Sequence, residues 1–126
     1  MTIHRPLAFL VLLTMLVIGA GQCHADEWMV GDTKREIAWQ VINVVDAGQT
    51  LDISKRCGEK YELNPILGRC PDSKVIAQYF ATAAMLHFGV SLALPRRYRA
   101  KWQIGTIVVS GAIVLNNYSI GLKINF

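Results

Sequence analysis

The sequence predicts an all-α membrane protein with a signal peptide, one amphipathic helix and then an antiparallel two-helix transmembrane hairpin. Three observations support this fold class. The 126 residues allow one domain at most. Hydrophobic residues make up 52% of the chain and charged residues only 17%, which is more apolar than a typical soluble domain. The apolar residues also gather in long runs, one at the N-terminus and two in the second half.

The charges are distributed unevenly along the chain. Residues 26 to 73 contain nine acidic and six basic side chains, whereas residues 74 to 126 contain six basic side chains and no acidic one. The bases of the second half flank its two apolar runs, as expected for a membrane hairpin. We therefore expect the lipid bilayer as a partner, together with another membrane protein or a second copy of the chain, and no nucleic acid.

Residues 1–25 have the layout of a signal peptide. The basic start "MTIHRP" precedes the apolar run "LAFLVLLTMLVIGA", and "GQCHA" predicts cleavage after Ala25. A lipoprotein modified at Cys23 is disfavoured because Gln22 is not the small residue that such signals need. An uncleaved anchor is the other alternative, although its apolar run is short for the ~20 residues of a spanning helix. Residues 26–126 are expected to form one small helical membrane domain.

An amphipathic helix is predicted over residues 34–54. Thr33 is expected as its N-cap, and Glu36 at the third helical position would complete a capping box. Apolar residues then recur at helical spacing from Ile37 to Leu51. This helix is too polar for a lone lipid-exposed span. It is therefore expected either to lie along the membrane surface or to pack against the other helices.

Two membrane-spanning helices are predicted over residues 74–94 and 97–117. Ser73 is expected to cap the first and Pro95 to end it. Each carries a stripe of small residues that permits close helix contact in lipid. The connection is short and carries four bases, which predicts antiparallel helices with a cytoplasmic turn. If the amphipathic helix does not cross, the loop before the hairpin is periplasmic and the protein lies in the inner membrane.

Cys57 and Cys70 are predicted to form a disulfide. After signal cleavage they are the two remaining cysteines, and an even pair in an exported protein indicates a bridge. The bond would contribute about 3 kcal/mol by the loop-entropy estimate. Two free thiols are the alternative if this loop faces the cytosol. Zinc binding is disfavoured because no second cysteine pair lies nearby.

The C-terminal segment "YSIGLKINF" alternates apolar and other residues with the period of a strand. Such a segment is typical of the last strand of an outer-membrane barrel. We set this alternative aside because the mature chain is barely long enough for about eight strands, and its middle has a helical pattern.

The stretches "DAGQTLDI", "YELNPILGR" and "NNYSIGLKINF" resemble a group of small envelope or membrane proteins of Gram-negative bacteria and their phages. These proteins carry a signal-like N-terminus and share the pattern D-x-G-Q-T-x-D, Y-E-x-N-P-x-L-G-R and N-Y-x-x-G. The resemblance covers most of the mature chain, and the Y-E-x-N-P-x-L-G stretch is its most specific part. The group has no established activity. The resemblance therefore implies an envelope protein and supplies no catalytic residue.

A cluster of polar residues is expected where the loop folds over the hairpin. Its members are Asn43, Asp46, Thr50, Glu62, Asn64, His87, Asn116 and Asn117. Such side chains could bind a cation or activate water, and Asp46, Glu62 and His87 are the catalytic candidates. No motif of a known enzyme class accompanies them. Structural polar contacts are the favoured interpretation. No cofactor is predicted, and a bound cation remains an open alternative.

Two functions from different classes follow. The first is a non-enzymatic envelope membrane protein that acts by contact with itself or with a partner membrane protein. The second is a membrane-embedded hydrolase, metal-dependent or acid/base, that uses Asp46, Glu62 and His87. The hydrolase requires the two carboxylates and the imidazole around one open cavity, whereas the contact function requires them to be paired with other groups.

Overall fold

The computed structural model describes residues 26–126, which form three α-helices and no β-strand. The helices are α2 (Val30–Lys55), α3 (Ser73–Ala93) and α4 (Arg96–Ser119). The all-α prediction is therefore confirmed for this part of the chain. The predicted signal peptide, its cleavage site and Cys23 lie outside the described residues.

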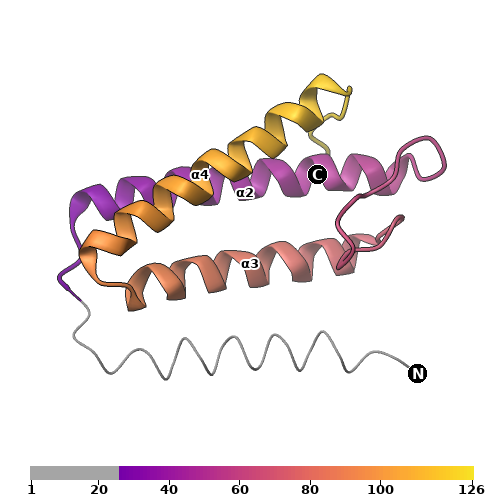
Figure 1. The fold of residues 1–126 in the computed structure, drawn as a ribbon. Helices are drawn as coiled ribbons and strands as arrows, with labels where there is room; N and C mark the ends of the chain where they lie inside the picture. Colours follow the sequence, from indigo (N-terminus) through magenta and orange to yellow (C-terminus); the bar gives the residue numbers. More distant parts are fainter. Residues whose placement is uncertain (1–25) are drawn as a thin grey trace.

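The three helices lie side by side, and α2 is the central one (Figure 1). α2 and α4 run in the same direction, and α3 runs in the opposite direction. α2 packs along both of the other helices, whereas α3 and α4 contact each other much less. The expected antiparallel pair of α3 and α4 is present. Of the two arrangements considered for the amphipathic helix, the chain adopts packing against the other helices.

The predicted start of the first helix is wrong. α2 begins at Val30, four residues before the predicted start, and Met29 is its N-cap. The carboxylate of Asp32, at the third helical position, accepts a hydrogen bond from the backbone N–H of Met29 at 3.0 Å. Thr33 does not cap, and its hydroxyl accepts from the Trp28 indole at 2.8 Å. Glu36 is buried in the bundle instead of closing a capping box.

The N-cap of α3 also lies one residue earlier than predicted. The Asp72 carboxylate accepts from the backbone N–H groups of Lys74 and Val75 at 2.8 and 3.0 Å. Asp72 is therefore the N-cap, and Ser73 is the first helical residue. Pro95 separates α3 from α4, because proline cannot continue the hydrogen bonds of the preceding helix.

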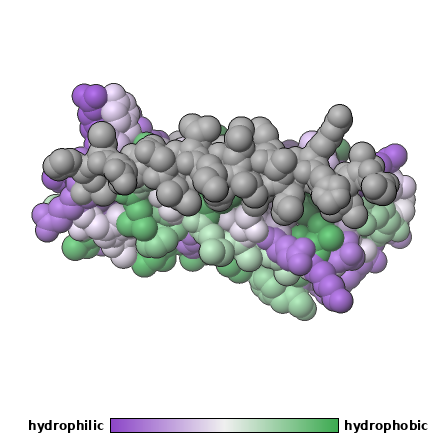
Figure 2. All heavy atoms as spheres, turned by 90° about the horizontal axis from the view of Figure 1, so that it is seen from below, coloured by the Kyte–Doolittle hydropathy of each residue, from purple (hydrophilic) through white to green (hydrophobic). Residues whose placement is uncertain are grey.

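The bundle is polar inside and largely apolar outside. Its buried polar residues are Asp32, Glu36, Asn43, Gln49, Thr50, Asp52, His87, Ser91, Arg99 and Gln103. Large apolar side chains are exposed on all three helices, for example Ile37 on α2, Met85 on α3 and Leu115 on α4. On the part of the surface visible in Figure 2, green apolar residues extend along the molecule, and purple hydrophilic residues lie mainly toward its ends. A small apolar core is present as well, but so many buried polar and exposed large apolar side chains are unusual in a water-soluble domain.

The C-terminal residues form an extended tail along α2 and not a strand. The backbone N–H of Asn125 donates to the Gly48 carbonyl at 3.1 Å. The backbone N–H of Lys123 donates to the buried Asp52 carboxylate at 3.1 Å. A Cβ on Gly48 would lie 2.7 Å from Cγ2 of Ile124, so the tail approaches α2 closely because this position is glycine.

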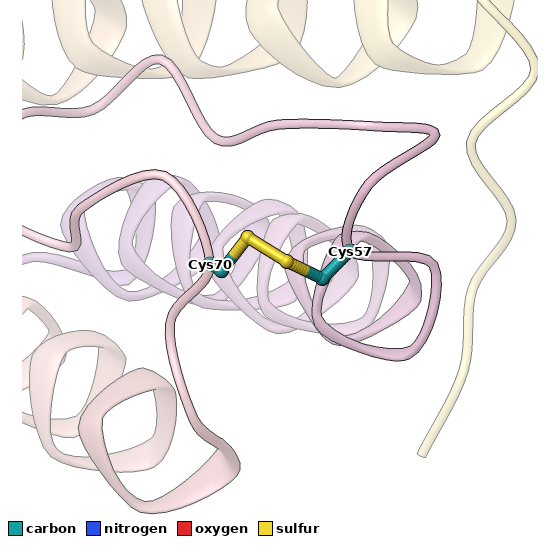
Figure 3. The surroundings of a disulfide bond; sticks show 2 residues. All are labelled: Cys57 and Cys70. Atoms are coloured by element: carbon teal, nitrogen blue, oxygen red, sulfur yellow. A yellow bond between two sulfur atoms is a disulfide. The ribbon is translucent and has the colours of Figure 1, made fainter.

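A disulfide joins Cys57 and Cys70, as predicted (Figure 3). It connects the segment after α2 to the segment that leads into α3, with the two Cα atoms 5.7 Å apart. The Lys60 ammonium donates a hydrogen bond to the Ile120 carbonyl at 2.9 Å, and the Arg56 guanidinium donates one to the Gly121 carbonyl at 3.2 Å. The loop is therefore fixed to the end of the bundle where α4 finishes.

Candidate functional site

The polar residues predicted to form one cluster are divided between separate places in the structure. Six of the eight line one cavity of about 590 Å³ at the loop end of the bundle. These six are Asp46, Thr50, Glu62, Asn64, Asn116 and Asn117. We call this space the loop-end cavity. Asn43 and His87 do not line it.

All three helices and the loop contribute walls to the loop-end cavity. Its remaining walls are formed by Ile53, Lys60, Tyr61, Leu63, Leu67, Tyr79, Phe80, Ala112, Ile113, Ile120 and Leu122. Asp46, Thr50 and Ile53 share one face of α2 because they are four and three residues apart. The cavity thus combines an apolar lining with a few polar groups, which is the usual composition of a small-molecule site.

The two carboxylates of the cavity have polar contacts but no ionic partner. Asp46 accepts a hydrogen bond from the Asn117 amide at 3.1 Å. Glu62 accepts one from the backbone N–H of Asn64 at 2.8 Å. Within residues 26–126, neither carboxylate forms a salt bridge. Lys60 also lines the cavity, but its ammonium donates to the carbonyl of Ile120. Two acidic groups therefore face one space, and the Lys60 cation in the lining forms no salt bridge with either of them.

The Asn64–Pro65 turn holds the loop against α3. The side-chain oxygen of Asn64 accepts from the backbone N–H of Ile66 at 3.0 Å, which is the turn-forming role expected of this residue. Its amide nitrogen donates to the Tyr79 hydroxyl at 2.8 Å. Leu67, three residues later in the same turn, packs with Ile76 in the small hydrophobic core. The loop wall of the cavity is therefore fixed by both polar and apolar contacts.

Asn43 connects two helices and does not itself line the cavity. It is buried, and its side-chain amide donates to the backbone carbonyl of Phe80 at 3.1 Å. The contact joins α2 to α3 at mid-length. Asn43 therefore has a structural role of the kind expected for an amide between packed helices.

His87 belongs to a different polar group and does not converge with Asp46 and Glu62. Its Nδ1 lies 3.0 Å from Oε1 of Glu36, and its Nε2 lies 2.8 Å from the Thr106 hydroxyl. Its ring stacks on Trp39 with the centroids 3.8 Å apart. The side chain is only 3% exposed. His87 therefore bridges all three helices, as expected of a hydrogen-bonded interhelical histidine.

A buried polar network surrounds His87. It consists of Asp32, Glu36, His87, Ser91, Arg99 and Gln103. Glu36 accepts from Ser91 at 3.0 Å and from Gln103 at 3.2 Å. Arg99 donates to Asp32 at 3.0 Å and to the Ser91 carbonyl at 2.7 Å. The Asp32 and Glu36 carboxylates are both hydrogen-bonded within this network. The network therefore stabilises the bundle and leaves no open polar group for a ligand.

Sequence reasoning missed Asp32, Glu36 and Arg99 as interior residues. Glu36 was assigned to a helix cap and Arg99 to an exposed turn, yet they are 6% and 1% exposed. One signal was available on α2, where Asp32, Glu36, Asn43 and Asp46 recur at three-, four- and seven-residue steps. Such a polar stripe between apolar residues indicates a helix whose polar face is turned into a bundle.

The possible metal ligands among residues 26–126 do not form a metal centre. Among residues 26–126, no group of three or more His, Cys, Asp or Glu side chains is placed to hold a metal ion. No family model matches the chain, and no curated protein or solved structure is similar to it. Any function is therefore inferred from the geometry of this chain itself.

Proposed function

We propose that the protein is a small membrane protein of the cell envelope that acts by contact with itself or with a partner membrane protein. The observation that carries this proposal is the arrangement of polar residues inside the bundle and apolar residues outside. In a bilayer, apolar side chains can face the lipid without a cost in free energy, whereas polar side chains must find hydrogen-bond partners within the protein. The bundle meets the first condition and most of the second; among the described residues, Oε1 of Gln49, Nε of Arg56 and Nε1 of Trp102 are buried without a partner.

The dimensions of the helices support embedding in a bilayer. α3 is the one helix among the described residues whose length and hydropathy suit a membrane crossing. α2 has 26 residues and is about 39 Å long at 1.5 Å per residue, more than the ~30 Å hydrocarbon core. Its acidic residues face the bundle, while Ile37, Val41 and Val44 face outward. We therefore propose that α2 crosses together with the hairpin.

The disulfide supports an inner-membrane orientation with the loop end in the periplasm. A bridge between Cys57 and Cys70 persists in an oxidising compartment and not in the cytosol. Charge alone does not set the orientation once α2 crosses, because basic residues lie at both ends of the bundle. Arg96, Arg97 and Lys101 lie at one end, and Lys55, Arg56 and Lys60 lie at the other.

Exposed small residues support action by helix contact. The stripes of small residues were expected to bring α3 and α4 together, but α2 makes most of the interhelical contacts instead. Gly105 on α4 is exposed, and a Cβ there would meet no atom within 4 Å. Ala77 and Ala81 on α3 are exposed as well. Outward-facing small residues permit close approach of a further helix in lipid.

The proposal is tested by extraction and association. We expect the protein to resist alkaline carbonate and to leave membranes only with detergent. Gly105→Leu should weaken self-association or partner capture after cross-linking in native membranes. Exposed Met85→Leu serves as a volume-conserving control on α3 and should change nothing. Release by carbonate would contradict the membrane assignment, and an unchanged cross-linking pattern for Gly105→Leu would contradict the contact surface.

The hydrolase alternative receives less support. It required His87 beside Asp46 and Glu62, but His87 is engaged by Glu36 and Thr106 and does not line the cavity. The two carboxylates alone share an open space. What this space can bind is a separate question, because a contact protein can carry a ligand site as well.

A further inference from the structure

The outer face of α3 is apolar and exposed, and no helix among residues 26–126 covers it. Met85, Phe88 and Leu92 share this face because they are three and four residues apart, and Met85 is 76% exposed. Ala77 and Ala81 continue the face toward the start of α3 and are exposed as well. α3 packs against α2 and, to a lesser extent, α4 through its other side. Its outer face can therefore accept a further helix, and the two alanines permit a close approach in lipid.

The described chain begins beside this face. The Asp26 carboxylate accepts from the backbone N–H of Arg96 at 2.7 Å, and the Asp26 carbonyl accepts from the Arg99 guanidinium at 2.9 Å. Two residues later, the Trp28 ring packs edge-on against Phe88 of the outer face, with the ring centroids 5.7 Å apart. Because consecutive Cα atoms are ~3.8 Å apart, the N-terminal segment must join the bundle at this point.

The N-terminal segment has the length and the composition to cover α3. Its apolar run over residues 7–20 contains no charged side chain, and Pro6 directly before the run suits the first turn of a helix. Residues 5–25 equal α3 in number, since α3 has 21 residues. A helix of that length measures about 31 Å, enough for the ~30 Å hydrocarbon core. The polar residues Gln22 and His24 then lie near the membrane surface, beside the basic turn.

The covalent connection favours this segment over a second copy of the chain as the occupant. A partner that is joined to its binding face through a short link acts at a high effective concentration, on the order of millimolar. The link here is short, because Asp26 and Trp28 already contact the bundle at the end of the face. The segment therefore reaches the outer face of α3 without the cost of bringing two molecules together.

We propose that residues 1–25 stay attached to the chain and that residues 5–25 form a fourth helix on the outer face of α3. This helix is parallel to α3, so Met1 lies at the loop end of the bundle. If residue 25 is level with Ala93, Val17 is level with Met85, because each lies eight residues earlier in its helix. The proposal rests on the proposed crossing of α2, since that topology is the one that retains the N-terminal segment.

Cysteine cross-linking in native membranes tests the contact. The background is full-length protein that carries Cys23→Ser and keeps the Cys57–Cys70 disulfide. Val17→Cys is combined with Met85→Cys on α3 or, as the matched control, with Ile104→Cys on α4. Both positions are exposed, and both lie eight residues from the helix end at the basic turn. A short bismaleimide is added after permeabilisation, and peptide mass spectrometry measures the products.

The cross-link to Met85→Cys should exceed the cross-link to Ile104→Cys by at least about fivefold. Moving the first cysteine through positions 13–20 should make the yield rise and fall with a helical period. Equal or absent cross-links in a chain that retains residues 1–25 would overturn the fourth helix. That result would leave the membrane assignment intact, because carbonate extraction measures it independently.

Two further results would also overturn the proposal. A cross-linked product of twice the mass of the chain would show that a second copy occupies the outer face of α3. A mature chain that begins at Asp26 would exclude the fourth helix and, together with an intact disulfide, the crossing of α2 as well. The intact mass of the purified chain therefore distinguishes failure of this proposal alone from failure of the topology on which it rests.

Discussion

The carboxylate of Glu36 holds the three helices together at one point. Besides His87 on α3, it accepts hydrogen bonds from Ser91 on α3 and Gln103 on α4, and from Gln40 on its own helix. Glu36 is 6% exposed, so water is not available to replace these contacts. Loss of a single acceptor leaves several donors without a partner, which is the costly case for buried polar groups.

Glu36→Ala should therefore lower the free energy of unfolding by about 1–3 kcal/mol, the cost of leaving buried polar groups without a partner. Glu36→Gln keeps the shape and one acceptor, and it should cost less. Denaturant-induced unfolding in detergent measures both. The control is Glu59→Ala at an exposed loop position, which should change the stability by no more than about 0.5 kcal/mol. Similar losses for Glu36→Ala and Glu59→Ala would mean that the network does not stabilise the bundle.

A substitution at Gly48 tests the contact between α2 and the C-terminal tail. In Gly48→Ala the new Cβ would lie 2.7 Å from Ile124 and 3.0 Å from Phe126, so the tail must move. We expect a loss of about 1–3 kcal/mol, as for overpacking, and faster proteolysis of the tail. Gly89→Ala in α3 is the matched control, because a Cβ there meets no atom within 4 Å. A stability gain in both variants would show that the tail is not docked.

Residue-level prediction from the sequence succeeded where partners are close along the chain and failed where they are distant. Helical spacing alone puts Asp46 and Thr50 on one face, and an Asn-Pro pair is typical of a turn. Glu36 and Arg99 could not be placed, because their partners His87 and Asp32 are 51 and 67 residues away. No local pattern specifies such pairs, so both were assigned to local roles.

At the scale of elements, the helices themselves were predictable and the central position of α2 was not. Long apolar runs and Pro95 define α3 and α4 directly. For α2, two arrangements stayed open, along the membrane surface or packed against the other helices, because a sequence does not say where a polar face points. The structure turns that face into the bundle, where the Asp32 and Glu36 carboxylates find partners.

The disulfide is the element-level contact with the clearest energetic consequence. Replacement of both Cys57 and Cys70 by Ser should lower the free energy of unfolding by about 3 kcal/mol, because the unfolded chain gains the freedom of an open loop. Thermal unfolding of the oxidised protein, the reduced protein and the double variant measures this. Reduced protein and double variant should agree. Free thiols at both positions in freshly isolated membranes would contradict the prediction and the periplasmic position of the loop.

At the scale of the whole molecule, the position of Asp26 constrains any topology. Its carboxylate accepts from the backbone N–H of Arg96 at 2.7 Å, so the start of the described chain lies beside the basic turn. In a bundle that crosses the bilayer, these two segments share one side, and the disulfide loop lies on the other. Because the disulfide needs an oxidising compartment, we predict the basic turn in the cytoplasm.

Single cysteines test this orientation in a background that lacks Cys23 and keeps the disulfide. Ser119→Cys should react with an impermeant thiol reagent in intact cells, and Arg97→Cys should react only after permeabilisation. Both positions are exposed, whereas Arg99 is buried and unsuitable. Labelling of both in intact cells would show that the bundle does not cross the membrane. Labelling of Arg97→Cys alone would show the inverted orientation.

The proposed orientation also has a consequence for the cleavage of the signal peptide. A signal peptide removed after Ala25 leaves Asp26 on the outer side, together with the basic turn. Cleavage and a periplasmic disulfide therefore exclude each other in a crossing bundle. The intact mass of the chain from membranes should include residues 1–25. A mature chain that begins at Asp26 and carries the disulfide would contradict the proposed crossing of α2.

The distance along the chain between Glu36 and its partners also has a consequence for biosynthesis. Glu36 leaves the ribosome 51 residues before His87, and Asp32 leaves 67 residues before Arg99. At ~5–20 residues per second, α2 waits about 3–13 s for the second of these partners. Released alone into lipid, it would expose its four carboxylates to hydrocarbon. In the proposed crossing arrangement, α2 would therefore have to stay at the translocation machinery or its chaperone until α4 has been made, so that the three helices enter the bilayer as one unit.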